Sequence, residues 1–547
     1  MLSAIMILGH PGESFKYGIQ ILVVCIGFPI GTVLSTYIFL PVYFNCGVST
    51  TYEFLDLRFG KITRYTISTL FLMQMVLFMS VVLLAPVVAL SAVTNLSIEV
   101  SIVVFGLVCT FYCAVGGLRA VIWTDVFQAG LMFLCIIVMY VKGIDEAGGI
   151  AEVYKKAVEG QRVNLFDFNE DFIKRYTFIN SFLRGFLGAL AYYGTSQIEI
   201  QRLLSMKSLR SAKIALNWSI LPVAALVIMC SIFGLVLHTI FNTCNPVADP
   251  RTGVSGYDQI VPYYIITRLN AIPGLTGVCV AGIFSGSLST ISSALNSLAS
   301  VTVIDFLKPN FKSTKFSESK EVFIAKALSL FYGAICIGFT FLISKANSLI
   351  PISNTFLSMM EGPILAVYLI AVLTRKGSEK SILFGLLLGF AFTAWLGWGV
   401  LTSGYQPPPL PIDTTGCPTA ENISITFTNL TTLCENNEQC TVPVTTMAAL
   451  KAPPSEPFIL YKISFLWVST IGFVSTLIFI LIAIVFTGRH NVIPADSKCL
   501  SPVARFWIKG TIFEAKEKKQ SINMTERNLS AIQNDIEQNN IAVIKLP

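Results

Sequence analysis

Seven hydroxyl side chains lie within the apolar segment FSGSLSTISSALNS, residues 284 to 297. Gly282, Gly286, Ser289 and Ser293 recur at spacings of four, three and four, so one face of a helix would carry only small side chains. Such a face is typical of helices that pack closely in lipid. Ser289 and Thr290 lie at its edge, and two hydroxyls with backbone carbonyls would suit sodium, which takes oxygen ligands and must also be released. The pattern predicts either a packing surface or a cation site.

Three acidic residues in the apolar segments need an explanation. Asp125, in GGLRAVIWTDVFQ, is the clearest of them, and an ionisable group in a span costs at least about 2.5 kcal/mol unless it has a partner or an ion. Asp125 is therefore either a hydrogen-bonded structural carboxylate or an ion ligand. Glu199 and Arg202 are three residues apart near the end of a span, which favours their pairing at the cytoplasmic boundary. Glu361, in MMEGP, has no role that the sequence indicates.

Two apolar segments contain residues that weaken helices. ILGHPG (7–12) is expected to break the first segment, and YYGTSQ (192–197) a later one. Broken helices at corresponding places in two halves of a chain are typical of transporter binding sites, because unwound backbone offers free polar groups near the membrane midplane. Tyr192 and Tyr193 beside the second break would either line a solute site or pack in the core.

The composition is that of a polytopic membrane protein. Of 547 residues, 54% are hydrophobic and 13% charged, and a span needs roughly 20 apolar residues. We expect an all-α bundle with about eleven full spans. Their expected positions are 18–43, 64–93, 98–118, 121–143, 176–200, 214–241, 271–303, 323–346, 351–374, 381–404 and 459–486.

Basic residues gather in alternate links and predict the orientation, since Lys-rich and Arg-rich loops stay in the cytoplasm. The first residues are then outside and residues 1–486 form one bundle, with a largely disordered cytoplasmic tail at 487–547. Outside loops are expected near 144–175, 242–270 and 406–458. Three sequons fall in links predicted to be outside, one of them between 93 and 98, and are expected to be glycosylated: Asn95, Asn422 and Asn429.

Four of the thirteen cysteines fall in the expected outside loops, where disulfides persist. Four cysteines allow three pairings. We favour Cys244 with Cys417 and Cys434 with Cys440.

Several classes of function are disfavoured. The chain has only three histidines, no GxxxxGK[ST] phosphate loop and no TVGYG filter, which argues against a histidine metal site, ATP hydrolysis and a potassium channel. We expect no enzyme activity, no cofactor other than sodium as coupling ion, and no nucleic-acid partner. The sequence makes no prediction about oligomers.

The motifs YEFLDLRFG, VCTFYCAVGGLRAVIWTDVFQ, SGSLSTISSALNSLASVTVIDFLKP and CNPVADP resemble the sodium/solute symporter family, within it the branch of sodium-coupled monocarboxylate and multivitamin transporters. The resemblance covers nearly all of residues 1–486. It implies the inverted five-helix repeat of the leucine-transporter fold, and import of a solute with sodium by alternating access. The family has thirteen or fourteen spans, so one span and half of the next would lie upstream of this chain.

The resemblance also implies sites. The main sodium site would use the hydroxyls of Ser289 and Thr290 and the carbonyls of Gly286 and Leu2, and Asp125 would serve a second sodium. The solute-lining positions would be Met6, Tyr192, Tyr193 and Thr355.

The function expected from these features is sodium-coupled import of small organic anions, such as monocarboxylates, biotin or pantothenate, across the plasma membrane. The partners would be the solute, sodium and the lipid bilayer. No Arg or Lys is expected in the pocket, so a neutral solute such as a sugar or polyol stays open. Further alternatives are an uncoupled channel-like leak and a sensor without transport.

Overall fold

The computed structural model describes residues 3–94, 96–254, 256–310, 318–344, 349–412, 417, 457–487, 493–494 and 497–508, and these residues form helices and links without a β-strand. The long helices are α1 (Ala4–Tyr17), α2 (Val24–Ile38), α5 (Lys61–Thr94), α6 (Ile98–Glu146), α8 (Phe178–Thr195), α10 (Leu209–Ile240), α12 (Leu275–Val301), α14 (Glu318–Ile343), α15 (Leu349–Leu373), α16 (Glu379–Thr402) and α18 (Phe465–Phe486). The shorter helices are α3 (Leu40–Cys46), α4 (Thr51–Arg58), α7 (Ile150–Glu159), α9 (Gln197–Leu204), α11 (Ile260–Tyr264) and α13 (Lys308–Asn310). The predicted all-α class is confirmed.

Ten helical segments in the described part of the chain are long and apolar enough to cross a bilayer. They are Ile19–Cys46, Lys61–Ser91, Ile98–Gly116, Trp123–Glu146, Leu209–Ile240, Leu275–Leu307, Ser319–Ile343, Ile350–Leu373, Glu379–Thr402 and Phe465–Phe486. Each overlaps one expected span. The remaining expected span, 176–200, corresponds to two shorter helices, α8 and α9.

Helix α6 contains two of these segments and turns back on itself between them. The Tyr112 hydroxyl forms a hydrogen bond with the Thr124 hydroxyl. Twelve residues of straight helix would separate these two positions by about 18 Å. The contact therefore requires a sharp reversal, as expected for two neighbouring spans.

The interruption predicted at YYGTSQ is present. Helix α8 ends at Thr195, and Ser196 is extended, with φ −74° and ψ 122°. Carbonyls freed at such an end destabilise an apolar interior unless they are bonded. The Tyr43 hydroxyl donates to the Gly194 carbonyl at 2.5 Å, and the Thr51 hydroxyl donates to the Thr195 carbonyl at 3.4 Å. Side chains from α3 and α4 thus form hydrogen bonds with the carbonyls that the break leaves free.

The interruption predicted at residues 7–12 is wrong. Helix α1 is continuous from Ala4 to Tyr17, with Pro11 inside it. A proline removes one helical hydrogen bond, but membrane helices tolerate this loss where neighbouring helices pack closely. Gly234 of α10 makes that approach possible, because a Cβ there would lie only 2.5 Å from the Pro11 carbonyl oxygen.

Helices α2 and α8 pack through glycines. A Cβ on Gly27 or Gly31 would lie 2.2 Å from the carbonyl oxygen of Phe182 or Phe186, and one on Gly185 would lie 2.3 Å from that of Val24. Glycines four residues apart allow backbones in lipid to approach this closely. Any larger side chain here would push α8 away, so these glycines fix the face that α8 turns to the interior.

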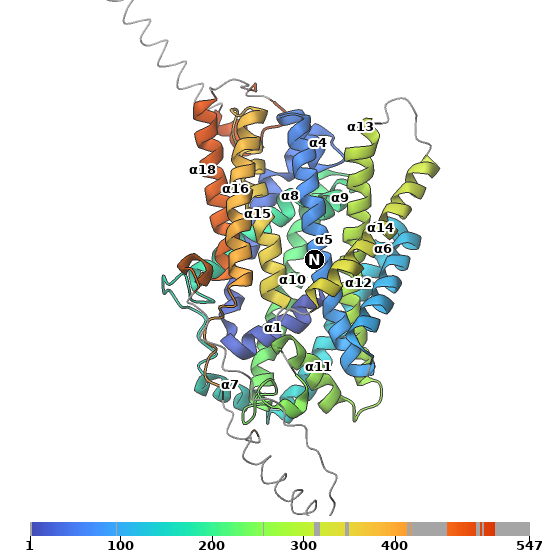
Figure 1. Ribbon diagram of the computed structural model, residues 1–547, viewed down its shortest axis with the longest axis vertical. Coiled ribbons are helices and arrows are strands. Elements are labelled where there is room, and N and C mark those ends of the chain that lie inside the picture. Colours follow the sequence, from blue (N-terminus) through green and yellow to red (C-terminus); the bar gives the residue numbers. More distant parts are fainter. Residues whose placement is uncertain are drawn as a thin grey trace, which may run out of the picture.

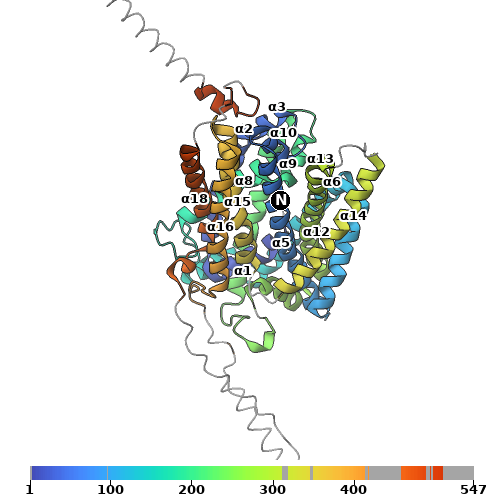
Figure 2. The same ribbon diagram turned by 45° about the horizontal axis from the view of Figure 1, so that its top comes forward.

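The helices form one bundle in which α16 and α18 lie on one side and α6 and α14 on the other, with α5 between them (Figures 1 and 2). Helices α4, α9 and α13 lie toward one end, and α7 and α11 lie at the opposite end (Figure 1). The first end adjoins the basic links and is the expected cytoplasmic end. Helix α1 begins near the middle of the bundle and runs toward the other end (Figure 1).

A disulfide joins Cys244 to Cys417 across 173 residues at the expected outer end. This is the pairing that the sequence favoured for these two residues. The other predicted disulfide and glycosylation positions lie outside the described residues: Cys434, Cys440, Asn95, Asn422 and Asn429.

Part of the expected tail packs against the bundle. The Ser501 amide donates to the Val372 carbonyl at 2.9 Å, and the Ile493 amide donates to the Arg375 carbonyl at 3.1 Å. Leu500 is buried. The segment 497–508 thus covers the end of α15 that is expected to be cytoplasmic, and residues 509–547 lie outside the described residues.

Candidate functional site

A cavity of about 300 Å³ lies within the bundle, lined mainly by α1, α2, α5, α8 and α15. Most of its lining is apolar or aromatic. Among the described lining residues, Arg184 and Glu361 are the only members of the types Arg, Lys, Asp and Glu. The cavity has the character of a ligand site, in which few polar groups are placed within an apolar wall.

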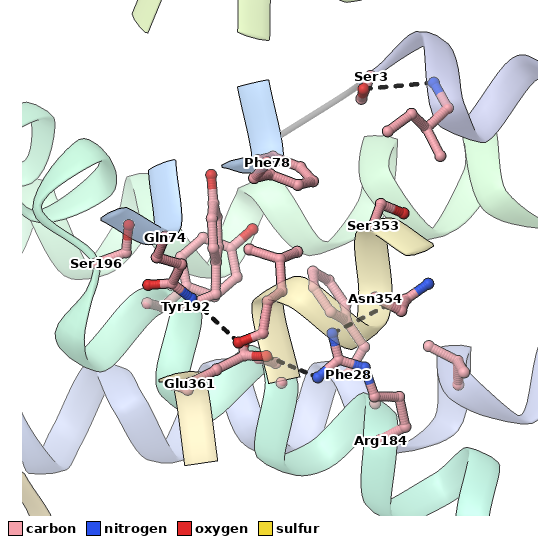
Figure 3. A pocket seen from close by; sticks show the side chains of 18 of the residues that line it. Ser3, Phe28, Gln74, Phe78, Arg184, Tyr192, Ser196, Ser353, Asn354 and Glu361 are labelled. Atoms are coloured by element: carbon pink, nitrogen blue, oxygen red, sulfur yellow. Dashed lines mark hydrogen bonds and ion pairs between the residues drawn. The ribbon is translucent and has the colours of Figure 1, made fainter. Parts of the chain in front are cut away.

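Arg184 reaches from α8 to two partners on α15 (Figure 3). Its Nη1 donates to Glu361 Oε2 at 2.7 Å, and its Nη2 donates to Asn354 Oδ1 at 3.2 Å. The Arg184 and Glu361 side chains are 11% and 12% exposed. Because both charges are largely removed from water, each would be costly to leave without the other. Asn354 and Glu361 lie about two helical turns apart, so one face of α15 supplies both.

Gly188 lies one turn further along α8, beside this ion pair. A Cβ added there would lie 3.4 Å from Arg184 Nη1 and 3.9 Å from Glu361 Oε1, at ordinary contact distance. The missing side chain therefore leaves room at the guanidinium for an atom of a ligand.

The expectation that the pocket holds no Arg or Lys is wrong, because Arg184 lines it. The signal was available: Arg184 is a basic residue inside the apolar run 176–200. An ionisable residue within a membrane segment usually faces a cavity or a partner. Glu361, whose role the sequence left open, is that partner.

The glycines of the small-residue face on α12 fit the first of its two interpretations, a packing surface. A Cβ on Gly282 would lie 2.4 Å from the Cβ of Cys135 on α6, and a Cβ on Gly286 would lie 2.6 Å from the amide nitrogen of Ala4 on α1. These glycines serve close packing. The hydroxyls further along α12 form the polar contacts described next.

Thr290 and Gly286, both expected to bind sodium, lie together. The Thr290 hydroxyl donates to the Gly286 carbonyl at 2.9 Å, next to the first turn of α1. Thr290 also lines the central cavity. The neighbouring Ser289 hydroxyl donates to Asp125 Oδ1 at 2.6 Å. Leu2, the other expected ligand, lies outside the described residues.

Asp125 is held by two hydrogen-bond donors. Besides Ser289, the Arg202 guanidinium donates to Asp125 Oδ2 at 2.7 Å and also contacts the Ser293 hydroxyl. This cluster joins α6, α9 and α12. The spacing had suggested that Arg202 pairs with Glu199, and this prediction is wrong. Arg202 forms its ion pair with Asp125. Glu199 instead accepts a hydrogen bond from the Tyr192 hydroxyl at 2.9 Å.

Three of the four expected solute-lining residues meet in the cavity: Met6, Tyr192 and Tyr193. The Tyr193 ring lies edge-on to Phe28, with centroids 5.9 Å apart. Thr355 is not in this lining. It is buried on α15, where its hydroxyl donates to the Pro351 carbonyl at 2.6 Å, and it borders a second pocket toward the expected outer end.

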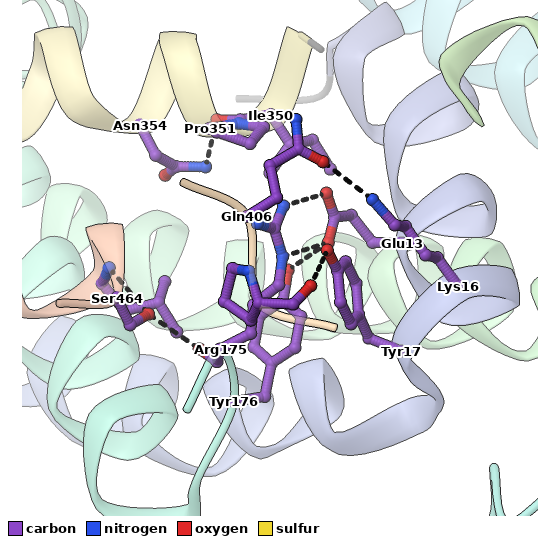
Figure 4. A network of polar contacts seen from close by, with 12 residues as sticks. Glu13, Lys16, Tyr17, Arg175, Tyr176, Ile350, Pro351, Asn354, Gln406 and Ser464 are labelled. Atoms are coloured by element: carbon purple, nitrogen blue, oxygen red, sulfur yellow. Dashed lines mark hydrogen bonds and ion pairs between the residues drawn. The ribbon is translucent and has the colours of Figure 1, made fainter. Parts of the chain in front are cut away.

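A polar network lies at the C-terminal end of α1, toward the expected outer end of the bundle (Figure 4). Arg175 Nε and Nη2 donate to Glu13 Oε2 and Oε1 at 2.9 and 2.5 Å, and the Tyr176 hydroxyl donates to Oε2 at 2.8 Å. Burial disfavours the charge on Arg175, but Glu13 holds the pKa of Arg175 above its usual value. The Arg175 carbonyl accepts from the Ser464 hydroxyl at 2.7 Å. The network ties α1 to the segments that precede α8 and α18.

The bundle, its largely apolar cavity and the hydroxyl-bearing helix beside it define a multi-pass membrane transporter. The model of the Sodium:solute symporter family matches residues 1–389. The chain belongs to this family. It is therefore a sodium-coupled symporter of solutes and not an enzyme, with sodium as its coupling ion.

Relatives and a solved structure agree with this assignment. The chain is 34% identical over 483 residues to the putative sodium-dependent multivitamin transporter of Drosophila melanogaster, covering 87% of this chain and 76% of that protein. It is 35% identical over 500 residues to human sodium-coupled monocarboxylate transporter 1, covering 90% and 79%. The structure of a Na⁺-coupled sialic acid symporter in a substrate-bound outward-open state superposes with a TM-score of 0.66 at 19% identity, covering 89% and 88%. This likeness confirms the leucine-transporter-like fold class.

Proposed function

We propose that this symporter imports small organic anions, such as monocarboxylates or carboxylate-bearing vitamins, across the plasma membrane by alternating access. The observation that carries the proposal is the position of Arg184 in an otherwise mostly apolar cavity. A guanidinium binds a carboxylate with two parallel hydrogen bonds and keeps its charge at any physiological pH. The names of the two relatives, which describe carriers of monocarboxylates and of vitamins, support the same class.

The cavity also suits the rest of such a solute. Its volume of about 300 Å³ lies at the lower end of the range for small-molecule sites, about 300 to 1,000 Å³. Ile21, Phe28 and Leu357 supply apolar wall for a hydrocarbon body. Met6, Tyr192 and Tyr193 would contact the solute, and Thr355 would face it in the outer pocket on its way in.

Sodium would bind at Gly286, Ser289 and Thr290, with the Leu2 carbonyl completing the site, and Asp125 would serve a second ion. Thr290 belongs both to this site and to the cavity wall. A sodium ion there would stabilise the state that binds solute. Bound sodium would then raise the affinity for the solute, and bound solute would raise the affinity for sodium.

The test is uptake of labelled butyrate, lactate, biotin and pantothenate by cells that express the chain, with sodium present or replaced by choline. Saturable uptake that needs sodium and is lost in Arg184→Gln, with surface expression retained, would support the proposal. Sodium-dependent uptake of glucose or inositol, but of none of the acids, would replace it by a neutral-solute symporter. Current without saturation or accumulation would indicate a channel-like leak.

A further inference from the structure

The central cavity contains one positive and one negative side chain in direct contact. Arg184 Nη1 and Glu361 Oε2 lie 2.7 Å apart, and both side chains are nearly buried. Among the described lining residues no other Arg, Lys, Asp or Glu occurs. In the empty carrier the charge of Arg184 is therefore already cancelled. Glu361 presents to the guanidinium the same group that an organic anion would present.

This arrangement changes the electrostatics of anion binding. If Arg184 stood alone, an anion would neutralise it and no further cation would be needed. With Glu361 in place, an entering anion gives the cavity a net negative charge. Two carboxylates close to one guanidinium repel each other, and the repulsion is strong where water is scarce.

A sodium ion at the proposed site would remove this excess. Thr290 lines the same cavity as Arg184 and Glu361, and its hydroxyl meets the Gly286 carbonyl at 2.9 Å. With sodium bound there, the positive charges of Arg184 and the ion balance the negative charges of Glu361 and the solute. The cavity is then neutral when empty and neutral when both ligands are bound.

We infer that Glu361 makes anion binding at Arg184 depend on sodium, because it cancels the charge of Arg184 until the ion is bound. This inference rests on the proposed function. Glu361 acts through Arg184 and is a positioning residue, whereas Arg184 contacts the solute. Asn354 holds Arg184 Nη2 at 3.2 Å independently of Glu361. The guanidinium therefore keeps one partner when Glu361 is neutralised.

The test compares the wild type with Glu361→Gln in the uptake of labelled butyrate and biotin, each at high and at low sodium. In the wild type, lowering sodium should raise the KM for the acid by about tenfold, within the usual range of such couplings. In Glu361→Gln the KM at low sodium should fall toward the KM at high sodium. The ratio of KM at low sodium to KM at high sodium should then shrink to about threefold or less. Glu361→Asp keeps the charge and should retain the wild-type ratio.

The matched control is Asp305→Asn, which neutralises another buried carboxylate that pairs with an arginine, Arg64, but lies outside the cavity lining. It should leave the sodium dependence of KM unchanged. If Glu361→Gln keeps the wild-type ratio or raises KM at both sodium concentrations, the pair is only structural and the inference is overturned. The same holds if Glu361→Gln does not reach the surface and Glu361→Asp has lost the wild-type ratio. If the wild type shows no sodium-dependent uptake of any acid, the proposed function fails, and the inference with it.

Discussion

The Arg202 guanidinium lies 2.7 Å from the Asp125 carboxylate and joins α9 to α6. The other Asp125 oxygen accepts from Ser289, one of the expected sodium ligands. A cationic side chain therefore shares the carboxylate that a second sodium would use. In this conformation the arginine and the ion would compete, so the two partners of the pair should influence sodium binding in opposite directions.

Asp125→Asn should raise the sodium concentration for half-maximal uptake by about threefold or more, because a nearby negative charge is lost. Arg202→Gln should lower that concentration, because it frees Asp125 Oδ2. Sodium titrations of solute uptake in both variants check the prediction. If both titrations coincide with that of the wild type, the cluster only holds the three helices together.

Removing both hydroxyls at the proposed main site should abolish the sodium response. Ser289→Ala combined with Thr290→Ala should lower sodium-dependent uptake at least about tenfold, because the ion loses two oxygen ligands. Ser287→Ala is the control: Ser287 lies on the same helix, is buried as Thr290 is, and its hydroxyl donates to the Val82 carbonyl of α5 at 3.0 Å. Uptake and surface labelling are measured together. A double variant with a normal sodium response would refute the site.

The sequence alone could predict which residues gather on the proposed ion-binding side of the site. Ser289 and Thr290 are neighbours within one helix, so their proximity follows from helical spacing. Asp125 stood out because a lone carboxylate in an apolar span requires a partner. The break at Ser196 was also visible, since several residues that weaken helices adjoin it.

The contacts on the proposed solute-binding side could not be predicted in the same way. Arg184 and Glu361 are 177 residues apart, and their contact depends on how α8 and α15 face each other. That orientation is set by backbone approaches such as those of Gly27 and Gly185, which no local pattern encodes. Likewise, Pro11 indicated a break, but packing of α10 against α1 keeps the helix continuous.

Gly188→Ala should weaken solute binding while leaving the proposed sodium ligands in place. The added methyl would lie 3.4 Å from Arg184 Nη1, at ordinary contact distance, so the fold should tolerate it. It would occupy the space proposed for the solute carboxylate, and the KM for the transported acid should rise by about tenfold, as expected when a group at the centre of a binding site is displaced. Gly130→Ala on α6, where nothing lies within 4 Å, is the control. An unchanged KM in Gly188→Ala would place the solute away from Arg184.

Glu13→Gln should destabilise the protein, because Arg175 would keep its charge at a position where its side chain is only 10% exposed. Breaking a buried pair on one side costs about 3 to 5 kcal/mol, so thermal unfolding of the purified protein should occur several degrees lower. Glu152→Gln is the control, since Glu152 and its partner Lys155 are exposed and 3.9 Å apart, and such pairs contribute at most about 1 kcal/mol.

The double variant Glu13→Gln with Arg175→Gln identifies the cause of that loss. If the unpaired charge is responsible, removing it as well should recover part of the stability, and the two single effects should not add. Additive losses would show instead that Glu13 and Arg175 act through separate contacts, for example through the hydrogen bond from Tyr176 to Glu13. In that case the network would not be the connection between α1 and the segment before α8 that its geometry indicates.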